Sequence, residues 1–464
     1  MYDTDALAPR ATIPQRLDRL PLTWTLWRLG LVTQAGWAVV VATDAIAARI
    51  YPFIWAPRHA FDTAAFSVLL LVSTGVGIVA GEYFFALLSD RFGRRRTLLA
   101  ASATCGLGTL PAGFVDNFWL LTLSLGIGAM GIGGVLATCT VYMAEVAPSQ
   151  VRGRMTQASQ AFAIFLLAVL TSLIGILLMP EHYQAYVVVM AAGPLLLVPL
   201  VAFVLPESPR WLDAHGRHEQ AEVVVSMLER DSEARAGPLP APITGTEAPQ
   251  TRVTVRDLFG PEYRHRTVLL LACWLLGYSG LVYGVIGFLN LYLAQVGFSA
   301  QAVFISGLIS GLVGGAAGLL AAARLNERVE RRALILAGAL VACLGLVLEF
   351  MAGEVWHSLL ALSIAAVVLN AGAYLWLFNM YTYTAVAYPT GIRSVGTGWT
   401  DGFGHLGSMV SPLIVGALFT ATAHLGYIGF FGYVIIPGAL LPALLIARFG
   451  VKQKAAPLET VAGS

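Results

Sequence analysis

The stretch LSDRFGRRRTLL, residues 88–99, returns in a second version, LNERVERRALIL, at residues 325–336. A second pair of stretches, PSQVRG at 148–153 and PTGIRS at 389–394, is separated by nearly the same distance along the chain. Two matches at nearly equal spacing indicate an internal duplication. Each stretch is short and polar and follows a long apolar segment, so the pairs mark equivalent loops in two related halves.

The composition around these loops is that of a membrane protein. Hydrophobic residues make up 57% of the 464-residue chain and charged residues only 12%, whereas soluble proteins carry about 25% charged residues. The mean hydropathy is +0.75, and the net charge of +2 is too small to indicate a nucleic-acid partner. A helix needs about 20 apolar residues to cross a bilayer. We therefore predict twelve membrane-spanning helices, at residues 27–50, 65–88, 97–115, 118–144, 157–179, 183–205, 268–293, 302–323, 333–353, 357–381, 394–423 and 427–449.

The distribution of lysine and arginine predicts the orientation. With both termini in the cytoplasm, all 28 basic residues except Arg49 and Arg58 fall at the inner side, as the positive-inside rule requires. Repeated six-helix halves are typical of transporters, whose substrate site lies between the halves near the middle of the membrane. We predict an all-α integral membrane protein with two pseudo-symmetric six-helix bundles. Its parts are a cytoplasmic tail at 1–26, a bundle at 27–205, a cytoplasmic loop at 206–266, a bundle at 267–449 and a cytoplasmic tail at 450–464.

Three loop motifs resemble those of one transporter superfamily. DRFGRRR at 90–96 is similar to the signature that follows the second helix in the major facilitator superfamily. EVAPSQVRG at 145–153 and PESPRWL at 206–212 resemble the branch that holds sugar porters, organic ion carriers and metabolite:proton symporters. RLDRLPLTWTLWRLGLVTQAGW at 16–37 resembles the nicotinate and other aromatic-acid porters of that branch. The resemblance covers nearly the whole chain and implies a transporter of the inner cell membrane, not an enzyme. We expect it to act as a monomer in the lipid bilayer, without a cofactor or metal ion.

The acids and arginines of these loops are candidates for a gate at the cytoplasmic end. Ion pairs between the two halves would close that end in an outward-open state and break when it opens. The plainer alternative is that the arginines only set the topology. Val386 takes the place in the second half that Glu145 has in the first, so the second half should contribute a weaker or differently paired gate. The candidate gate residues are Asp90, Arg91, Gly93, Arg94, Arg95, Glu145, Arg152, Glu207, Arg210 and Arg393.

Four ionisable residues fall inside the predicted spans, and two more, Arg49 and Glu349, lie nearer the outer ends of theirs. A charged group at the middle of a bilayer costs about 2.5–3.5 kcal/mol on insertion scales, so each is a candidate for function. The four residues inside the spans are Asp44, Glu82, Asp401 and His405. The resemblance implies a proton-coupling role for Asp44. Glu82 could bind a proton or contact the eleventh span.

His405 lies in TDGFGHLGSMVSP, residues 400–412. Counted from Arg393 it is about 18 Å into the membrane, near the middle of a core about 30 Å thick. Asp401 precedes it by one helical turn and should share its face. Such a pair could hold the imidazole protonated to bind a carboxylate, or it could carry a coupled proton, because imidazole titrates near neutral pH. The alternative is a buried pair that only fixes helix packing.

The remaining polar and aromatic residues favour a flat, charged ligand over a polyol. The seventh span lacks the glutamine pair that sugar porters share, and few amides are available, although a dry sugar site needs many hydrogen-bond partners. We therefore predict a proton-coupled symporter of a small organic acid, with aromatic carboxylates as one class. The further candidate binding residues are Trp274, Tyr278, Tyr283, Asn290, Asn370 and Tyr374.

The sequence supports other substrate and function classes less strongly. An organic cation, with Asp401 and Asp44 as counter-ions, is the second substrate class, and a sugar or polyol is the third. A sensor would normally add a signalling domain, whereas the tails and the central loop at 206–266 are short. Within that loop, residues 218–236 are predicted to form an amphipathic helix. No nucleophile–base motif, HExxH motif or phosphate-binding loop indicates an enzyme. The glycine-rich GIGAMGIGG, residues 126–134, lies inside the fourth span and predicts close helix packing.

Overall fold

The regular secondary structure of the computed structural model is helical throughout the residues that it describes. The first half contains α1 (Ile13–Asp18), α2 (Trp24–Ile50), α3 (Ala56–His59), α4 (Thr63–Leu70), α5 (Ile78–Phe92), α6 (Arg94–Thr109), α7 (Phe118–Val146), α9 (Ile174–Leu178) and α10 (Tyr183–Val204). The described residues are 11–59, 62–148, 155, 159, 162–163, 165–242, 254–325, 328–389, 392–419 and 423–451.

The central loop and the second half supply the remaining helices. The loop contains α11 (Pro209–Ala214), α12 (His218–Ala236) and α13 (Val255–Leu258). The second half contains α14 (Arg264–Gly277), α15 (Tyr283–Gln295), α16 (Ala300–Ile309), α17 (Gly315–Leu325), α18 (Arg331–Met351), α19 (Leu359–Ala387), α20 (Arg393–Gly404), α21 (Gly407–Phe419), α22 (Ala423–Tyr433) and α23 (Leu441–Phe449).

The predicted all-α membrane fold is confirmed. Ten continuous helical segments among the described residues, some of which join two of the helices given above, are long and apolar enough to cross a membrane. The other two predicted spans are shorter. The third span is α6, which begins with three consecutive arginines. The fifth is the apolar helix Phe165–Leu178. Several of the residues that precede Phe165 lie outside the described ones. The chain is therefore a multi-pass membrane protein.

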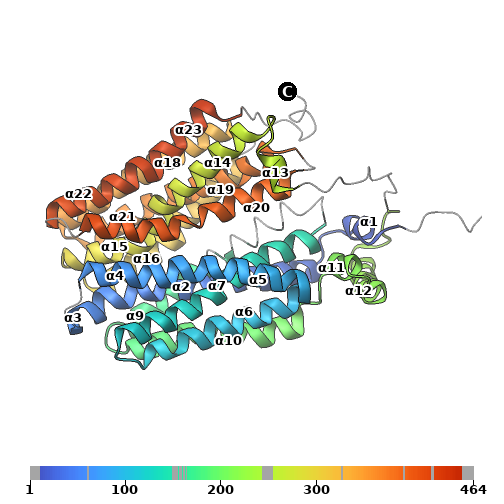
Figure 1. The fold of residues 1–464 in the computed structure, drawn as a ribbon, viewed down its shortest axis with the longest axis horizontal. Coiled ribbons are helices and arrows are strands. Elements are labelled where there is room, and N and C mark those ends of the chain that lie inside the picture. Colours follow the sequence, from blue (N-terminus) through green and yellow to red (C-terminus); the bar gives the residue numbers. More distant parts are fainter. Residues whose placement is uncertain are drawn as a thin grey trace, which may run out of the picture.

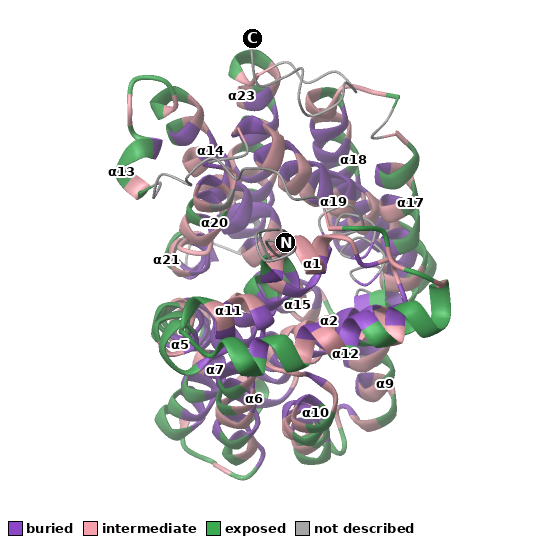
Figure 2. Ribbon diagram, turned by 90° about the vertical axis from the view of Figure 1, so that its right-hand side faces the viewer, coloured by how far each residue is buried: buried purple, intermediate pink, exposed green. Residues whose placement is uncertain are grey.

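The helices form two bundles that lie side by side, the first half in blue to green and the second in yellow-green to red (Figure 1). α1, α11 and α12 lie at one end of the first bundle, next to the turn between α5 and α6 (Figure 1). We call this the arginine-rich end, because residues 91–96 lie there, and we call the opposite one the far end. Figure 2 looks onto the arginine-rich end and shows buried residues along the inside of each bundle and exposed ones on its outer faces.

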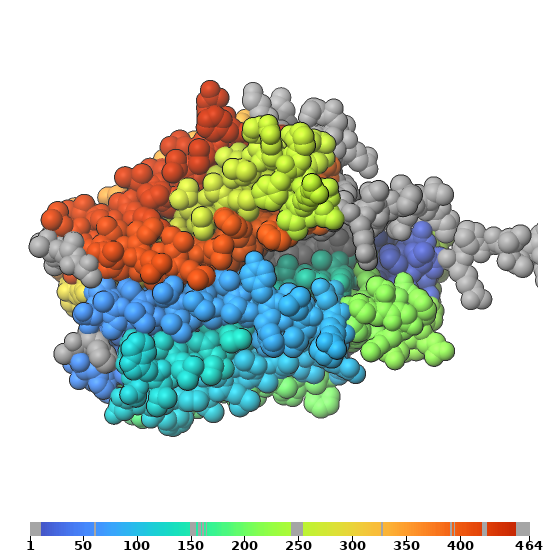
Figure 3. Space-filling view, viewed as in Figure 1, coloured from blue at the N-terminus to red at the C-terminus, as the bar shows by residue number. Residues whose placement is uncertain are grey.

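The two bundles contact each other at the far end. α21 packs against α4, α15 packs against α2, and α16 packs against the turn at Val169–Leu173. The ring of Phe66 in α4 meets that of Phe288 in α15 edge-on, with 5.3 Å between the centroids. α20, by contrast, packs against α14 and α19 of its own bundle. The surface view shows the bundles touching near the far end and a recess between them nearer the arginine-rich end (Figure 3).

Close packing within the first bundle depends on the glycines of the fourth span. A Cβ atom at Gly131 of α7 would collide with the backbone of Cys105 in α6, and one at Gly133 would collide with the carbonyl of Ile78 in α5. Only glycine allows these three helix backbones to approach so closely. The packing predicted from residues 126–134 is thus confirmed.

Several spans that face the other bundle contain π-helical turns, and the fifth has one at Val169–Leu173, next to α16. The second and eighth spans, which correspond in the duplication, have such turns at Leu71–Gly77 and Ser310–Gly314. The seventh has one at Tyr278–Val282. A π-turn widens the helix and shifts the side chains that follow it, and such turns are frequent at functional sites.

The amphipathic helix predicted at 218–236 is α12, and it holds the N-terminal helix α1 in place. Arg16 forms ion pairs with Glu222 at 2.6 Å and with Glu229 at 2.5 Å, and Arg19 contacts Glu229 at 2.5 Å. The hydrogen bond from Arg16 lowers the pKa of Glu222. Partial burial raises the pKa of Glu229, but the hydrogen bonds from Arg16 and Arg19 outweigh it and hold that pKa below its usual value.

The attachment of α1 to α12 is expected to weaken in acid. Because both carboxyl groups have a lowered pKa when α1 is attached, the stabilisation is complete above their usual pKa of 4.5 and is lost as the pH falls through the lowered values. Hydrogen exchange of residues 13–18, corrected for the intrinsic rate, should be slow down to about pH 5 and faster below about pH 4. In the Glu229→Gln variant, hydrogen exchange of residues 13–18 should be fast already at neutral pH. The same exchange should stay slow in Glu219→Gln, because Glu219 is exposed. Exchange independent of pH would contradict this role of the ion pairs.

Candidate functional site

The eleventh span is broken at its histidine. α20 ends at Gly404, and α21 begins at Gly407. Within α21, Pro412 has no N–H to donate to the carbonyl of Ser408 one turn earlier. His405 therefore lies in the short turn that separates the two helices.

His405 connects the two bundles. Its Nδ1 atom lies 3.0 Å from Oε1 of Glu82 in α5 and 3.2 Å from the hydroxyl of Tyr283 at the start of α15. Both charged side chains are largely buried, with 14% and 17% of their surface exposed. A protonated imidazole donates to Glu82, whereas a neutral one can accept from Tyr283. Glu82 thus reaches the eleventh span, one of the two roles that its position predicted.

Asp401 has different partners from those expected. Its side chain accepts a hydrogen bond of 2.8 Å from Tyr278, whose hydroxyl also lies 2.6 Å from that of Tyr381 in α19. Asp401 and His405 share a backbone hydrogen bond of 3.3 Å, whereas the imidazole contacts Glu82. Among the described contacts there is no direct hydrogen bond or ion pair between the side chains of Asp401 and His405, which make these two separate contacts.

Tyr381 was missed by the sequence interpretation. It lies seven residues after Tyr374, which was a candidate, so the two tyrosines are two turns apart on one face of α19. This spacing was the available signal. The ring of Tyr278 also meets that of His405 edge-on, with 4.9 Å between the centroids, so the tyrosines fill the space between the two charged groups.

Asp44 lies in α2 at the boundary between the bundles. It accepts a hydrogen bond of 3.0 Å from Thr74 in the second span. Together with Tyr283 and Ser408 it lines a small recess between the bundles. Tyr283 therefore contacts His405 on one side and faces the recess of Asp44 on the other. The structure brings Asp44, Glu82, Asp401 and His405 into one region.

A larger cavity, of about 300 Å³, lies between the bundles beside this region. Asp44 lies at its edge, and Asn290, Asn370 and Tyr374 line it from the second bundle. Most other lining side chains are aliphatic. Small-molecule sites usually measure about 300–1,000 Å³ and combine apolar walls with a few polar groups. The cavity fits a small, mainly apolar ligand.

Trp274 lies behind the tyrosines. It is fully buried, and its indole N–H donates to Thr384 at 3.0 Å. Its ring packs against Tyr278 and Tyr381 at centroid distances of 5.0 and 4.9 Å. Trp274, a candidate binding residue, therefore packs behind the two tyrosines and holds their rings in place.

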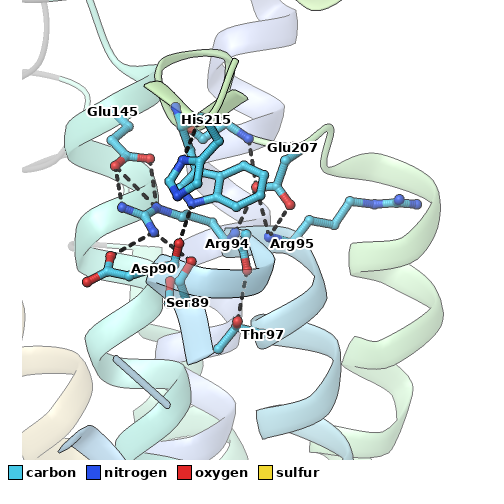
Figure 4. A network of polar contacts seen from close by, with 11 residues as sticks. Ser89, Asp90, Arg94, Arg95, Thr97, Glu145, Glu207 and His215 are labelled. Carbon is cyan, nitrogen blue, oxygen red and sulfur yellow. Dashed lines mark hydrogen bonds and ion pairs between the residues drawn. The ribbon is translucent and has the colours of Figure 1, made fainter. Parts of the chain in front are cut away.

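Arg94 joins the helices at the arginine-rich end of the first bundle (Figure 4). Its guanidinium donates to Glu145 of α7 at 2.8 Å, to Asp90 at 3.0 Å and to the carbonyl of Ser89 at 2.7 Å. Only 7% of Arg94 is exposed. The arginine thus fixes the ends of α5, α6 and α7 relative to one another.

Glu207 caps the start of α6 in the same network (Figure 4). Its carboxylate accepts from the backbone N–H groups of Arg94 at 2.8 Å and Arg95 at 3.2 Å, where the helix dipole favours a negative charge. Gly93 precedes them with φ of +99°, a conformation that favours glycine. A Cβ atom at Gly93 would also collide with the carboxylate of Glu207.

The other gate candidates have partners in their own half of the chain. Arg210 donates to Asp18 at 3.0 Å, Arg393 donates to the carbonyl of Tyr388 at 3.3 Å, and Arg91 lies over the ring of Phe92. Arg152 lies outside the described residues. Because the bundles contact each other at the far end, the ion pairs expected between the halves stay a prediction for a state in which the arginine-rich end is closed.

Comparison with known proteins finds a matching family and many relatives. The family model described as sugar (and other) transporter matches residues 28–461. The chain is 27% identical to the niacin transporter NiaP of Acinetobacter baylyi, over 96% of this chain and 98% of that protein. It is 28% identical to the gallate transporter of Pseudomonas putida, over 83% of this chain and 84% of that protein. Among solved structures, the partially occluded inward open conformation of the xylose transporter XylE from E. coli shares the fold, with a TM-score of 0.70 at 16% identity, covering 93% of this chain and 99% of that one.

Proposed function

Because this chain belongs to the sugar (and other) transporter family of the major facilitator superfamily, we propose that it carries a small organic acid together with protons across the cytoplasmic membrane. Aromatic carboxylates are the first candidates. The observation that carries the proposal is the 3.0 Å contact between Glu82 and His405, which joins the two bundles inside the membrane. Asp44 and Asp401 lie in the same region.

The relatives and the cavity support an organic acid. The two named relatives are transporters of niacin and of gallate, and both compounds are aromatic carboxylates. The cavity has mainly apolar walls with Asn290 and Asn370 as its amides, which suits a flat ring better than a polyol. A sugar would leave many hydroxyl groups without partners.

The contact between Glu82 and His405 supports proton coupling. A proton on Glu82 removes its negative charge and therefore the attraction that links α5 to the eleventh span. A single protonation then changes the free energy of moving one bundle relative to the other. Asp44 adds a second link, since it lines the cavity. An anion in the cavity and a negative charge on Asp44 repel each other, so binding of the anion and binding of a proton favour each other.

The same proposal assigns an orientation. The tail at 1–26, the loop at 206–266 and the tail at 450–464 face the cytoplasm, and the bundles at 27–205 and 267–449 move against each other around the cavity. The arginine-rich end then faces inward, in agreement with the positive-inside rule. Contact between the bundles at the far end corresponds to a state that is closed toward the outside.

Proton-coupled uptake of a carboxylate is expected to make the medium more alkaline. External pH would be recorded in lightly buffered, de-energised cells with and without the protein, while benzoate, 4-hydroxybenzoate, nicotinate, choline or xylose is added. An alkaline shift with a carboxylate, absent in cells without the protein, supports the proposal. Failure of every carboxylate to shift the pH contradicts it. A response to choline alone would favour the organic-cation class, with Asp44 and Asp401 as counter-ions, and a response to xylose alone would favour the sugar class.

A further inference from the structure

Arg49 brings a guanidinium group to the wall of the cavity. The side chain comes from α2 and lies over the ring of Phe304 in α16, with its Cζ atom 4.7 Å from the ring centroid. Its Nε and Nη1 atoms are buried and have no hydrogen-bond partner among the described residues. Buried polar groups without partners are costly, and the planar guanidinium fork matches a carboxylate in two parallel hydrogen bonds. The wall therefore offers an anion site.

Glu349 lines the same cavity from the second bundle. It lies in α18 and is only 1% exposed. Its Oε2 atom is buried and likewise has no hydrogen-bond partner within the described part of the chain. The described ion pairs do not include one between Glu349 and Arg49. The cavity thus has a cationic donor on one bundle and a carboxyl group on the other, and each needs a partner.

A ligand that lies between these groups would satisfy both. We infer that the cavity binds an organic anion whose carboxylate is held by Arg49 and whose other end donates a hydrogen bond, from a hydroxyl or N–H group, to Glu349. This inference rests on the proposed function and names the residues that select the substrate. Because Arg49 and Glu349 belong to different bundles, the bound molecule also links the bundles across the cavity.

Transport kinetics in proteoliposomes test the two contacts separately. The uptake of benzoate would be compared with that of 3- and 4-hydroxybenzoate, which add a hydrogen-bond donor at the meta and para positions of the ring. Arg49→Gln should raise KM for all three by about 10- to 100-fold, as expected for loss of hydrogen bonds to a charged group. The KM values of Arg49→Lys should lie between those of the wild-type protein and of Arg49→Gln, because an ammonium group keeps the charge but cannot form two parallel hydrogen bonds.

Substitution of Glu349 tests the preference for hydroxylated substrates. The wild-type protein should prefer the better hydroxybenzoate over benzoate by about tenfold, the effect of one hydrogen bond to a charged group. Glu349→Met should remove this preference, so that KM for the better hydroxybenzoate approaches that for benzoate in the same variant. A folded Glu349→Met protein that keeps the preference would overturn the assignment.

Arg58 provides the matched control for Arg49. It is also an arginine near the far end that lies over an aromatic ring, that of Tyr183 at 4.7 Å, but it is exposed. Arg58→Gln should leave KM unchanged. Thermal unfolding of each purified variant identifies any that fail to fold, in which case Arg49→Lys carries the test. Wild-type KM values in both Arg49 variants would overturn the inference, whereas a wild-type protein that transports no carboxylate would contradict the proposed function itself.

Discussion

Replacing Glu82 by glutamine is expected to abolish proton-driven accumulation of the substrate while leaving substrate exchange intact. An amide cannot bind and release a proton, so the proton gradient no longer drives uptake. With one proton per anion, a gradient of one pH unit supports about tenfold accumulation, and the variant should reach a ratio near one. Exchange of labelled for unlabelled substrate needs only the loaded protein, and the neutral amide resembles the protonated carboxyl group.

His405→Gln should impair both kinds of transport. It removes the 3.0 Å contact of Glu82 and leaves a largely buried carboxylate without its charged partner, which is costly in a membrane interior. Accumulation and exchange would both be measured in proteoliposomes with an imposed pH gradient. The combination His405→Gln with Glu82→Gln should recover part of the exchange, since no unpaired charge remains.

Glu181 and His182 supply matched controls for these variants. Both are exposed in the connection before α10, so Glu181→Gln and His182→Gln should accumulate substrate like the wild-type protein. Accumulation above the external concentration by Glu82→Gln would show that another group carries the proton. Asp44, which lies at the edge of the same cavity, would then be the next candidate.

Replacing Arg94 by methionine is expected to destabilise the protein more than any other change at the arginine-rich end. The side chain is 7% exposed and donates to Glu145, Asp90 and the carbonyl of Ser89. Its removal leaves Glu145 partly buried without its cation. Breaking a buried ion pair on one side typically costs about 3–5 kcal/mol, so thermal unfolding in detergent should occur roughly 5–10 °C lower.

The comparison with a neighbouring arginine separates burial from charge. Arg91 is exposed and lies over Phe92, so Arg91→Met should change the unfolding temperature little. Arg94→Met combined with Glu145→Gln should regain part of the lost stability, because the orphaned charge is gone, and the difference measures the coupling of the pair. Equal unfolding temperatures for Arg91→Met and Arg94→Met would contradict this account of the network.

The sequence alone determined the fold class and the region of the candidate site. The length of each apolar run, the arginines of residues 91–96 and the repeated loops are local properties, and the bilayer converts them directly into spans. The same constraint identified Asp44, Glu82, Asp401 and His405, because an ionisable side chain inside a span is costly wherever it lies. None of these conclusions requires knowing which helices are neighbours.

Only the tertiary structure decided which of these groups meet. The His405 imidazole contacts Glu82, more than 300 residues away, because the packing of the two bundles presents α5 to it. Arg49 and Glu349, which the sequence placed near the outer ends of their spans, line one cavity because α2 and α18 belong to bundles that converge there. Spacing along a helix predicts neighbours within that helix, but partners on different helices depend on how the spans pack.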